Sequence, residues 1–343
     1  MAQNNTPNLL DIDNLSVEYK TRRGVARGVD QVTLHLPVNR TLGLAGESGC
    51  GKSTLGRAIM RQVAYPGKIV EGDIFFNLCR DVHFNHHVLE AGEINLMGLH
   101  PKEMRALRGQ EIAYIFQDPM TSLNPMAKIG THFVEIMQAH DPEIDEETAL
   151  ERAREMLDSL GILPERVSDY PHQFSGGMRQ RVMIGLGLIL HPSLLIADEP
   201  TTSLDVIVEA QILEEMAGLK DEFNLTMILI THNLGVLAQT ADNIAIMYTG
   251  RIMELSPTKD LFEEPLHPYA QALLRSVPDV THPEKDLSWI PGAPPDLVDP
   301  IPGCMYNPRC PHAMDVCKER VPPLVEIKDG RLVACHLFSE GNA

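Results

Sequence analysis

The residue types and spacing of a phosphate-binding loop occur at Gly46-Glu47-Ser48-Gly49-Cys50-Gly51-Lys52-Ser53-Thr54. Glycines adopt backbone angles that are closed to other residues, so successive N–H groups can surround an anion. We expect Lys52 to reach the β- and γ-phosphates, Ser53 to bind Mg²⁺ and Thr54 to bond phosphate, while Cys50 fills a variable position. The stretch therefore predicts a nucleoside triphosphate site, and the alternative is a glycine turn without a ligand.

Two adjacent carboxylates, Asp198 and Glu199, follow the apolar segment 194–197. Open α/β sheets gather their ligands at the carboxyl ends of such strands. Asp198 can hold Mg²⁺ through its water shell, and Glu199 can orient and polarise the water that attacks a γ-phosphorus. Standing alone, the pair would favour a helix cap or a solvated turn.

Other polar residues lie where they could complete a site for phosphoryl chemistry. Gln117 follows the apolar segment 112–116 and His232 follows the segment 227–231, so each could meet a γ-phosphate from a strand end. A lone histidine there would be structural. Residues 174–181, Phe-Ser-Gly-Gly-Met-Arg-Gln-Arg, place a serine and two glycines ahead of a predicted helix, which is a second potential anion site.

The elements that must position these residues follow from the hydrophobic pattern. Alternation at 15–19 and 32–36 predicts half-buried strands of an antiparallel sheet. Continuously apolar segments at 194–197 and 227–230, separated by a predicted helix at 206–222, indicate parallel strands covered on both faces. Further strands are predicted at 72–76, 92–96 and 112–116, and helices from about 129 to 190, including 146–160 with Gly161 at its end. The predicted fold class is α/β, with an antiparallel β subdomain and an α-helical subdomain at about 120–190.

The composition limits the function classes. The 343 residues include 47 acidic and 29 basic ones, a net charge of −18, which argues against broad binding to nucleic acid or anionic lipid. The start of the chain has no basic segment followed by an apolar one, and no apolar run reaches the roughly 18 residues of a membrane span. We expect a cytosolic chain that meets a membrane only through a partner.

In order and spacing these motifs resemble those of the ATP-binding-cassette (ABC) ATPases, over residues 9 to about 255. The resemblance implies a P-loop NTPase (RecA-like) core. It also identifies Tyr19 as the aromatic residue that stacks on adenine, against the alternative of a core tyrosine. The implied motifs are Walker A at 46–54, the Q-loop Gln117, the signature Ser175-Gly176-Gly177, Walker B Asp198 with catalytic Glu199, the D-loop residue Asp205 and the switch histidine His232.

Cassettes of this family pair head to tail, so the resemblance implies a partner. Each ATP then lies between the Walker A loop of one cassette and the signature of the other, and hydrolysis frees the two halves. The signature reads FSGGM where the family has LSGGQ, so Met178 replaces a glutamine and we expect less hydrogen bonding there.

The segments 117–125 and 267–274 resemble the ATPase subunits of dipeptide and oligopeptide importers, and the second is typical of their C-terminal extension. This implies an ABC ATPase domain at 1–257 and an extension at 258–343. It also implies a second, nonidentical cassette, two membrane permeases and an extracytoplasmic solute-binding protein, with the chain peripheral on the cytoplasmic face. Nickel or glycoside import, or a soluble cassette outside transport, remain as alternatives.

Beyond residue 274, prolines between positions 278 and 302 break any regular element and lead into a cysteine-rich tail. Four cysteines follow, which could ligate a [4Fe–4S] cluster or Zn²⁺, with free thiols or disulfides as the alternative. The resemblance favours [4Fe–4S], which would staple a segment too poor in apolar residues to fold alone. These cysteines are Cys304, Cys310, Cys317 and Cys335.

The segment 78–91 looks inserted into a strand connection. It carries His83, His86 and His87 at a spacing that could bind a metal ion on a helix. We expect a solvated surface loop instead.

Overall fold

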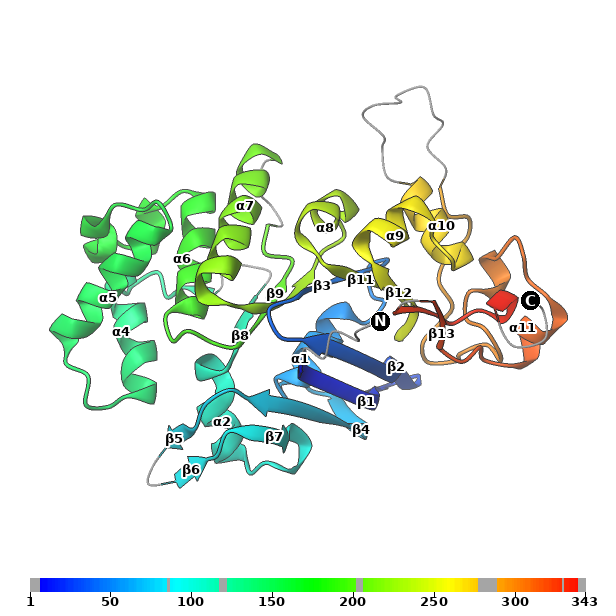
Figure 1. Ribbon diagram of the computed structural model, residues 1–343, viewed down its shortest axis with the longest axis horizontal. Helices are drawn as coiled ribbons and strands as arrows, with labels where there is room; N and C mark the ends of the chain where they lie inside the picture. The colour runs from blue at the N-terminus through cyan, green and yellow to red at the C-terminus, as the bar shows by residue number, and fades with distance from the viewer. Residues whose placement is uncertain are drawn as a thin grey trace. The chain divides into compact units, whose positions relative to one another are not determined.

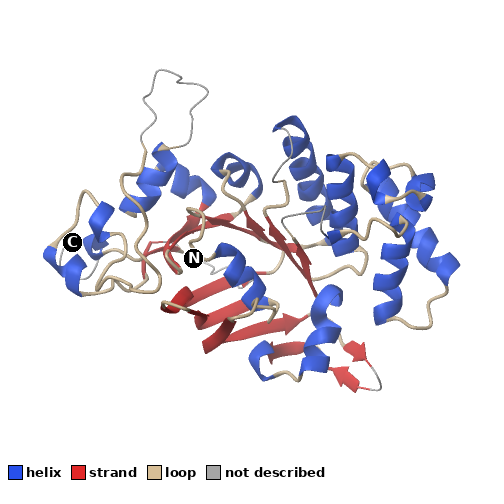
Figure 2. Ribbon diagram, turned by 180° about the vertical axis from the view of Figure 1, so that it is seen from behind, coloured by secondary structure: helices blue, strands red, loops and turns tan. Residues whose placement is uncertain are grey.

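The computed structural model describes residues 7–84, 87–116, 122–201, 206–276, 289–328 and 330–338. The chain forms two compact units, and most of their elements are labelled in Figure 1 and all described ones are coloured by type in Figure 2. The first unit comprises Met1–Leu10, Pro37–Asn39 and Phe75–Ile228, and the second comprises Asp11–Leu36, Arg40–Ile74 and Leu229–Ala343. The boundary therefore falls within strands β1 (Asn8–Thr21), β4 (Gly67–Leu78) and β10 (Thr226–Ile230).

In the second unit, β1 lies between β2 (Gly24–Pro37) and β4 in an antiparallel sheet. The alternation predicted this sheet, because Leu15, Val17, Val32 and Leu34 are all buried. The prediction is confirmed, although each strand is several residues longer than the pattern indicated.

Among the described residues, five strands of the eight-stranded second sheet belong to this unit, in the order β13-β14-β12-β11-β3. They are β3 (Thr41–Ala45), β11 (Asn243–Tyr248), β12 (Arg251–Pro257), β13 (Val325–Lys328) and β14 (Arg331–Val333). β3 and β11 run parallel, and β14 pairs antiparallel with β12. The proline-rich stretch was expected to hold no regular element, and its described residues, 289–302, contain no helix or strand. β13 and β14 lie beyond it in the cysteine-rich tail and were not predicted, because β12 supplies a partner strand that the local sequence does not reveal.

Short helices complete the second unit. They are α1 (Lys52–Ile59), α8 (Leu234–Thr240), α9 (Thr258–Glu263), α10 (Pro268–Arg275) and α11 (Asp315–Glu319), with single 3₁₀ turns at Asn307–Arg309 and His336–Phe338. The Asn233 side chain caps α8 by accepting from the N–H groups of Gly235 and Val236.

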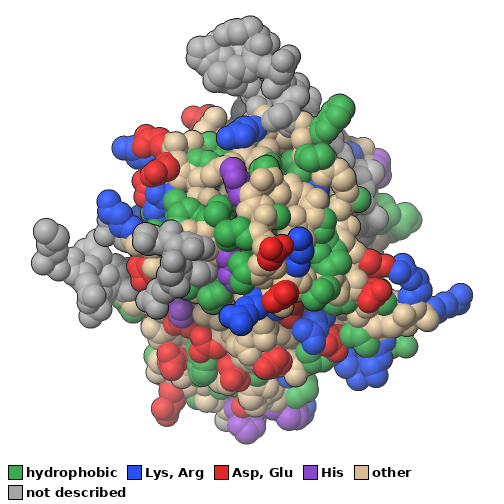
Figure 3. Space-filling view, turned by 90° about the vertical axis from the view of Figure 1, so that its right-hand side faces the viewer, with side chains coloured by type: hydrophobic (Ala, Val, Ile, Leu, Met, Phe, Trp, Pro, Cys, Tyr) green, Lys and Arg blue, Asp and Glu red, His purple; other side chains and the backbone are tan. Residues whose placement is uncertain are grey.

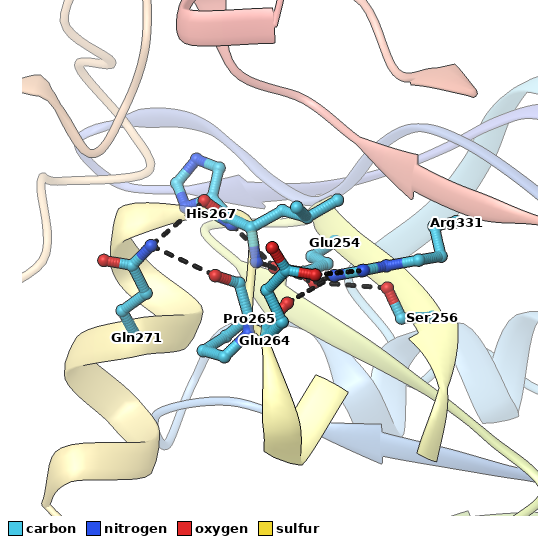
Figure 4. A network of polar contacts seen from close by, with 8 residues as sticks. Glu254, Ser256, Glu264, Pro265, His267, Gln271 and Arg331 are labelled. Carbon is cyan, nitrogen blue, oxygen red and sulfur yellow. Dashed lines mark hydrogen bonds and ion pairs between the residues drawn. The ribbon is translucent and has the colours of Figure 1, made fainter. Parts of the chain in front are cut away.

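A buried polar network fixes the start of α10 (Figure 4). The Glu254 carboxylate, fully buried on β12, accepts the N–H groups of Leu266 and His267 at 2.7–3.1 Å. Burial raises its pKa, and Arg331 of β14 lies 3.9 Å away. His267 in turn accepts the Tyr269 N–H as the helix cap. The network therefore sets where the side chains of α10 point.

In the first unit, β8 (Ile112–Ile115) and β9 (Leu194–Asp198) are parallel neighbours, with Ile115 opposite Ala197. The helices are α2 (Pro101–Gln110), α4 (Ile129–His140), α5 (Glu146–Ser159), α6 (Gly176–Leu188) and α7 (Val206–Phe223), with 3₁₀ turns at Leu96–Gly98, Pro164–Ser168 and Pro171–Gln173. α5 matches its prediction, because Asp145 caps its start and Gly161 follows its end with φ 66°. Among the described residues, no helix is both long and apolar enough to cross a membrane.

The inserted segment is a β-hairpin, so the prediction of a loop is wrong. β5 (Val82–Phe84) pairs antiparallel with β6 (His87–Leu89), and the end of β4 pairs with β7 (Gly92–Asn95). His83 lies opposite Val88 and His87 opposite Phe84, while residues 85–86 lie outside the described ranges. Paired strands replace the helix on which the histidine spacing could have bound a metal ion.

Candidate nucleotide-binding site

The glycine-rich stretch is a loop between the fully buried strand β3 and helix α1. Gly46 has φ 146° and Gly49 has φ 79°, which are conformations that favour glycine. A Cβ at Gly46 would also overlap the carbonyl oxygen of Met247, whereas a Cβ at Gly49 would meet open space. The loop therefore has the local geometry of the predicted strand–loop–helix phosphate site.

Lys52 is almost fully buried at the first position of α1, and its Nζ lies within the loop. It donates to the Gly46 carbonyl at 2.8 Å and to the Glu47 carbonyl at 3.2 Å. The Cys50 thiol, 3.6 Å from Nζ, also points inward, and burial raises its pKa. The ammonium is thus held among the atoms that surround the predicted phosphate position, and Cys50 fills space as a neutral thiol.

Tyr19 lies beside the first turn of α1. Its hydroxyl is 3.2 Å from the Thr54 Oγ1, and its ring passes over Gly28 and Gly67, where an added Cβ would come within 2.6–2.8 Å of ring carbons. The half-buried Tyr19 is therefore fixed on the edge of the loop, next to one of the residues predicted to contact ATP.

Asp198 and Glu199 end strand β9 as predicted. Asp198 is 2% exposed, and the Tyr114 hydroxyl from the neighbouring strand β8 donates to its Oδ2 at 2.7 Å. Glu199 has φ 47°, which is unfavourable for a residue with a Cβ and is typical of functional sites where the surroundings impose it. Sequence reasoning missed Tyr114, because an aromatic residue in an apolar run is typical of the core.

His232 is exposed two residues beyond the end of β10. The preceding Thr231 N–H donates to the Leu44 carbonyl at 3.3 Å, next to the end of β3. The backbone next to His232 is thereby bonded to β3, the strand that leads directly into the glycine loop.

Ser175, Gly176 and Gly177 form the start of α6, where the Ser175 hydroxyl caps the helix by accepting the Met178 N–H at 3.3 Å. The Met178 sulfur accepts from Arg166 Nη1 at 3.3 Å, so the residue that departs from the family pattern still has a polar partner. Gln117 and Asp205 lie outside the described residues.

The four C-terminal cysteines are reduced, and the structure gathers them. Three are buried, and the Cys304 N–H donates to the Cys317 carbonyl at 2.8 Å. Burial raises the pKa of Cys304 and of Cys335 to about 11. Cys310 and Cys317 add to the rise at both positions, and Cys304 adds to the rise at Cys335. Within the described ranges, no group of three or more His, Cys, Asp and Glu side chains is arranged to hold a metal ion.

Glu47 has contacts that the sequence did not indicate. Arg309, 262 residues further along the chain, binds its carboxylate with two hydrogen bonds at 2.7 and 2.9 Å. The Tyr269 hydroxyl accepts its N–H at 2.9 Å.

On the face shown in Figure 3, acidic and basic side chains drawn in colour are interspersed with hydrophobic ones.

Comparisons with known proteins agree with this geometry. Residues 29–202 match the family model described as ABC transporter, and residues 253–317 match the model described as oligopeptide/dipeptide transporter, C-terminal region. The dimeric structure of a post-hydrolysis state of an ATP-binding cassette bound to ADP and Pi has the same fold, with a TM-score of 0.61 and 22% identity, covering 73% of this chain and 98% of that one. The ABC cassette fold predicted from the motifs is thereby confirmed.

Whole-length relatives are more similar. The oligopeptide transport ATP-binding protein of Bacillus subtilis is 43% identical, covering 96% of this chain and 89% of that protein. The dipeptide transport ATP-binding protein of Escherichia coli is 40% identical, covering 96% of each. The chain therefore belongs to the ABC transporter family, among the ATP-binding proteins of its oligopeptide and dipeptide branch.

Proposed function

We propose that this chain binds and hydrolyses ATP to power the import of peptides across the cytoplasmic membrane. The observation that carries the proposal is the 43% identity to an oligopeptide transport ATP-binding protein over 96% of the chain. The buried Lys52 within a glycine loop between a strand and a helix supports it, because this arrangement binds nucleotide phosphates.

In this proposal the residues 46–54 bind ATP, with Tyr19 against the adenine. Mg²⁺ neutralises charge on the β- and γ-phosphates when bound, and its ligands would come from Ser53, Gln117 and Asp198. These groups present oxygen donors, which Mg²⁺ prefers. The hydrogen bond from Tyr114 to Asp198 supports the assignment, because it orients a buried carboxylate at the strand end.

Glu199 is the proposed catalytic base, assisted by His232 and Gln117. As a water oxygen bonds to the γ-phosphorus, the bond from that phosphorus to the bridging oxygen of ADP breaks. The Glu199 carboxylate accepts a hydrogen bond or proton from the water. The imposed positive φ of Glu199 supports this role, since a residue is held in such a conformation where its direction matters.

The proposed complex has a second, nonidentical cassette, two permeases and an extracytoplasmic solute-binding protein. Ser175, Gly176 and Gly177 would contact the ATP held by the other cassette, and Asp205 would lie at the cassette interface. Support comes from the exposed start of α6, where helix N–H groups are available to an anion. The chain acts on the cytoplasmic face of the membrane as a peripheral subunit.

The four gathered cysteines are proposed to hold a [4Fe–4S] cluster, with Zn²⁺ as the alternative. Four thiolates are the common ligand set of such a cluster, and the cysteines influence one another's pKa. The cluster would stabilise the segment from Cys304 to Cys335.

Isolation of the chain from its native membrane tests this function. We expect two permeases and a second cassette to accompany it, and ATPase activity of the reconstituted complex to rise with a peptide-loaded binding protein. Stimulation by nickel or glycoside alone would move the cargo to those alternatives. A chain recovered without membrane partners, with ATPase activity of its own, would support a cassette outside transport.

A further inference from the structure

Glu47, the second residue of the glycine loop, is held at two points by the C-terminal part of the chain. Its N–H donates to the Tyr269 hydroxyl at 2.9 Å. Its two carboxylate oxygens accept from Arg309, Nη1 to Oε2 at 2.7 Å and Nη2 to Oε1 at 2.9 Å. Both the backbone and the side chain of this loop residue are thereby fixed by residues more than 220 positions away.

The Arg309 guanidinium is buried and hydrogen-bonds to several parts of the chain. Its side chain is 4% exposed, while that of Glu47 is 26% exposed. Beyond Glu47, it donates from Nε to the Pro291 carbonyl at 2.8 Å and from Nη1 to the Tyr248 hydroxyl at 3.1 Å. The hydrogen bonds to Glu47 raise the pKa of Arg309, so it stays charged. The guanidinium of arginine can make this set of bonds because it presents several N–H groups in one plane, whereas lysine has a single nitrogen.

The second contact of Glu47 is equally well supported. Tyr269 is fully buried, and its place is set by the start of α10, where His267 caps the helix. Its ring packs against Tyr248 and Tyr306, with centroids 4.6 and 5.3 Å apart. The hydroxyl that accepts the Glu47 N–H therefore belongs to a ring packed in a buried aromatic cluster, and this restricts the backbone at Glu47.

Arg309 also lies within the cysteine segment. It immediately precedes Cys310, and Cys304 lies five residues before it, with one 3₁₀ turn at Asn307–Arg309 between the two thiols. Whatever fixes these two cysteines therefore fixes the position from which the guanidinium reaches the glycine loop.

We propose that Arg309 is a positioning residue for ATP binding, which holds the phosphate loop through Glu47 and makes nucleotide affinity depend on the four-cysteine segment. The inference rests on the proposed ATP site at 46–54. Its physical basis is preorganisation: the apparent Kd equals the intrinsic Kd divided by the fraction of molecules whose loop is correctly formed. If loss of the clamp lowers that fraction to about one tenth, ATP binds about tenfold more weakly.

The test is a titration of the full-length chain with Mg·ATP by calorimetry, at a temperature where circular dichroism shows each variant to be folded. We expect Arg309→Gln to raise the Kd about tenfold and Arg309→Lys to rescue it only in part, since Lys restores the charge without the fork. Lys318→Gln is the matched control, because it removes an exposed charge from the same segment and should leave the Kd unchanged.

A double-mutant cycle separates positioning from general loosening. In a Glu47→Gln background, Arg309→Gln should have little further effect on the Kd, because the two residues act through one contact. A full additional loss in that background, or wild-type affinity in Arg309→Gln, overturns the inference.

The variant Lys52→Ala tests the proposed ATP site separately from the role of Arg309. If the wild-type chain binds ATP and Lys52→Ala abolishes binding, the ATP site is supported whether or not the Arg309 variants change the Kd. If the wild-type chain shows no binding that depends on Lys52, the proposed function fails, and the inference fails with it.

Discussion

Replacing Gly46 by alanine tests the geometry of the glycine loop directly. The added Cβ would overlap the Met247 carbonyl oxygen of β11 and approach the Cys50 sulfur at 2.8 Å. Relief requires movement of strand backbone, which costs about 1–3 kcal/mol, and the φ of 146° adds about 1–3 kcal/mol of strain. We expect the free energy of unfolding to fall by about 2–6 kcal/mol in total.

Gly49→Ala is the matched control, since an added Cβ there meets nothing within 4 Å. Only its φ of 79° is unfavourable, so we expect a loss of about 1–2 kcal/mol. At roughly 2–4 °C per kcal/mol, thermal unfolding followed by circular dichroism should show Tm falling by roughly 4–24 °C for Gly46→Ala and roughly 2–8 °C for Gly49→Ala. Equal losses in the two variants would refute the steric argument.

Three further predictions address chemistry, the cysteines and pH. Glu199→Gln should keep ATP binding but lose turnover by a factor on the order of 10² or more, because the base is gone while the loop is intact; unimpaired phosphate release would remove Glu199 as the catalytic residue. Cys317→Ser should lose bound iron and its visible absorbance when purified without oxygen, and iron retained at the wild-type level would contradict the cluster. Burial lowers the pKa of His267 from its usual 6.5 to about 3, so below pH 6.5 the unfolded chain takes up a proton that the folded chain does not. Stability should therefore fall by about 2 kcal/mol from pH 6.5 to pH 5, measured by urea unfolding, and this part of the slope should vanish in His267→Asn, which keeps a helix-capping side chain; an unchanged slope in that variant would rule out His267 as its source.

Local patterns predicted most of the elements that carry the site. Burial determines residue type, so the buried faces can be read from the sequence. β1 and β2 alternate because one face of each is buried, and β9 and β10 are continuously apolar because both faces are buried. The glycine loop was predictable from backbone conformation instead, because few residues besides glycine tolerate a φ such as that of Gly46.

The parts that escaped prediction depend on partners far along the chain. β13 has mostly exposed residues and β14 is only three residues long, so their pairing with β12 leaves almost no local pattern. The pair of Glu47 and Arg309 joins positions 262 residues apart. Neither residue carries a local signal for the other, and only the folded chain shows that their side chains meet.

The addition of β14 and β13 to the sheet also changes which strand is left unpaired. Without them, β12 would present open N–H and C=O groups beside the buried side chains of Ile252, Met253 and Leu255, a combination that recruits strands from other molecules. The strand at the end of this sheet is instead β13, where Glu326 and Lys328 are exposed. Charged side chains on a short outer strand discourage such pairing, so the C-terminal segment protects this edge of the sheet against self-association.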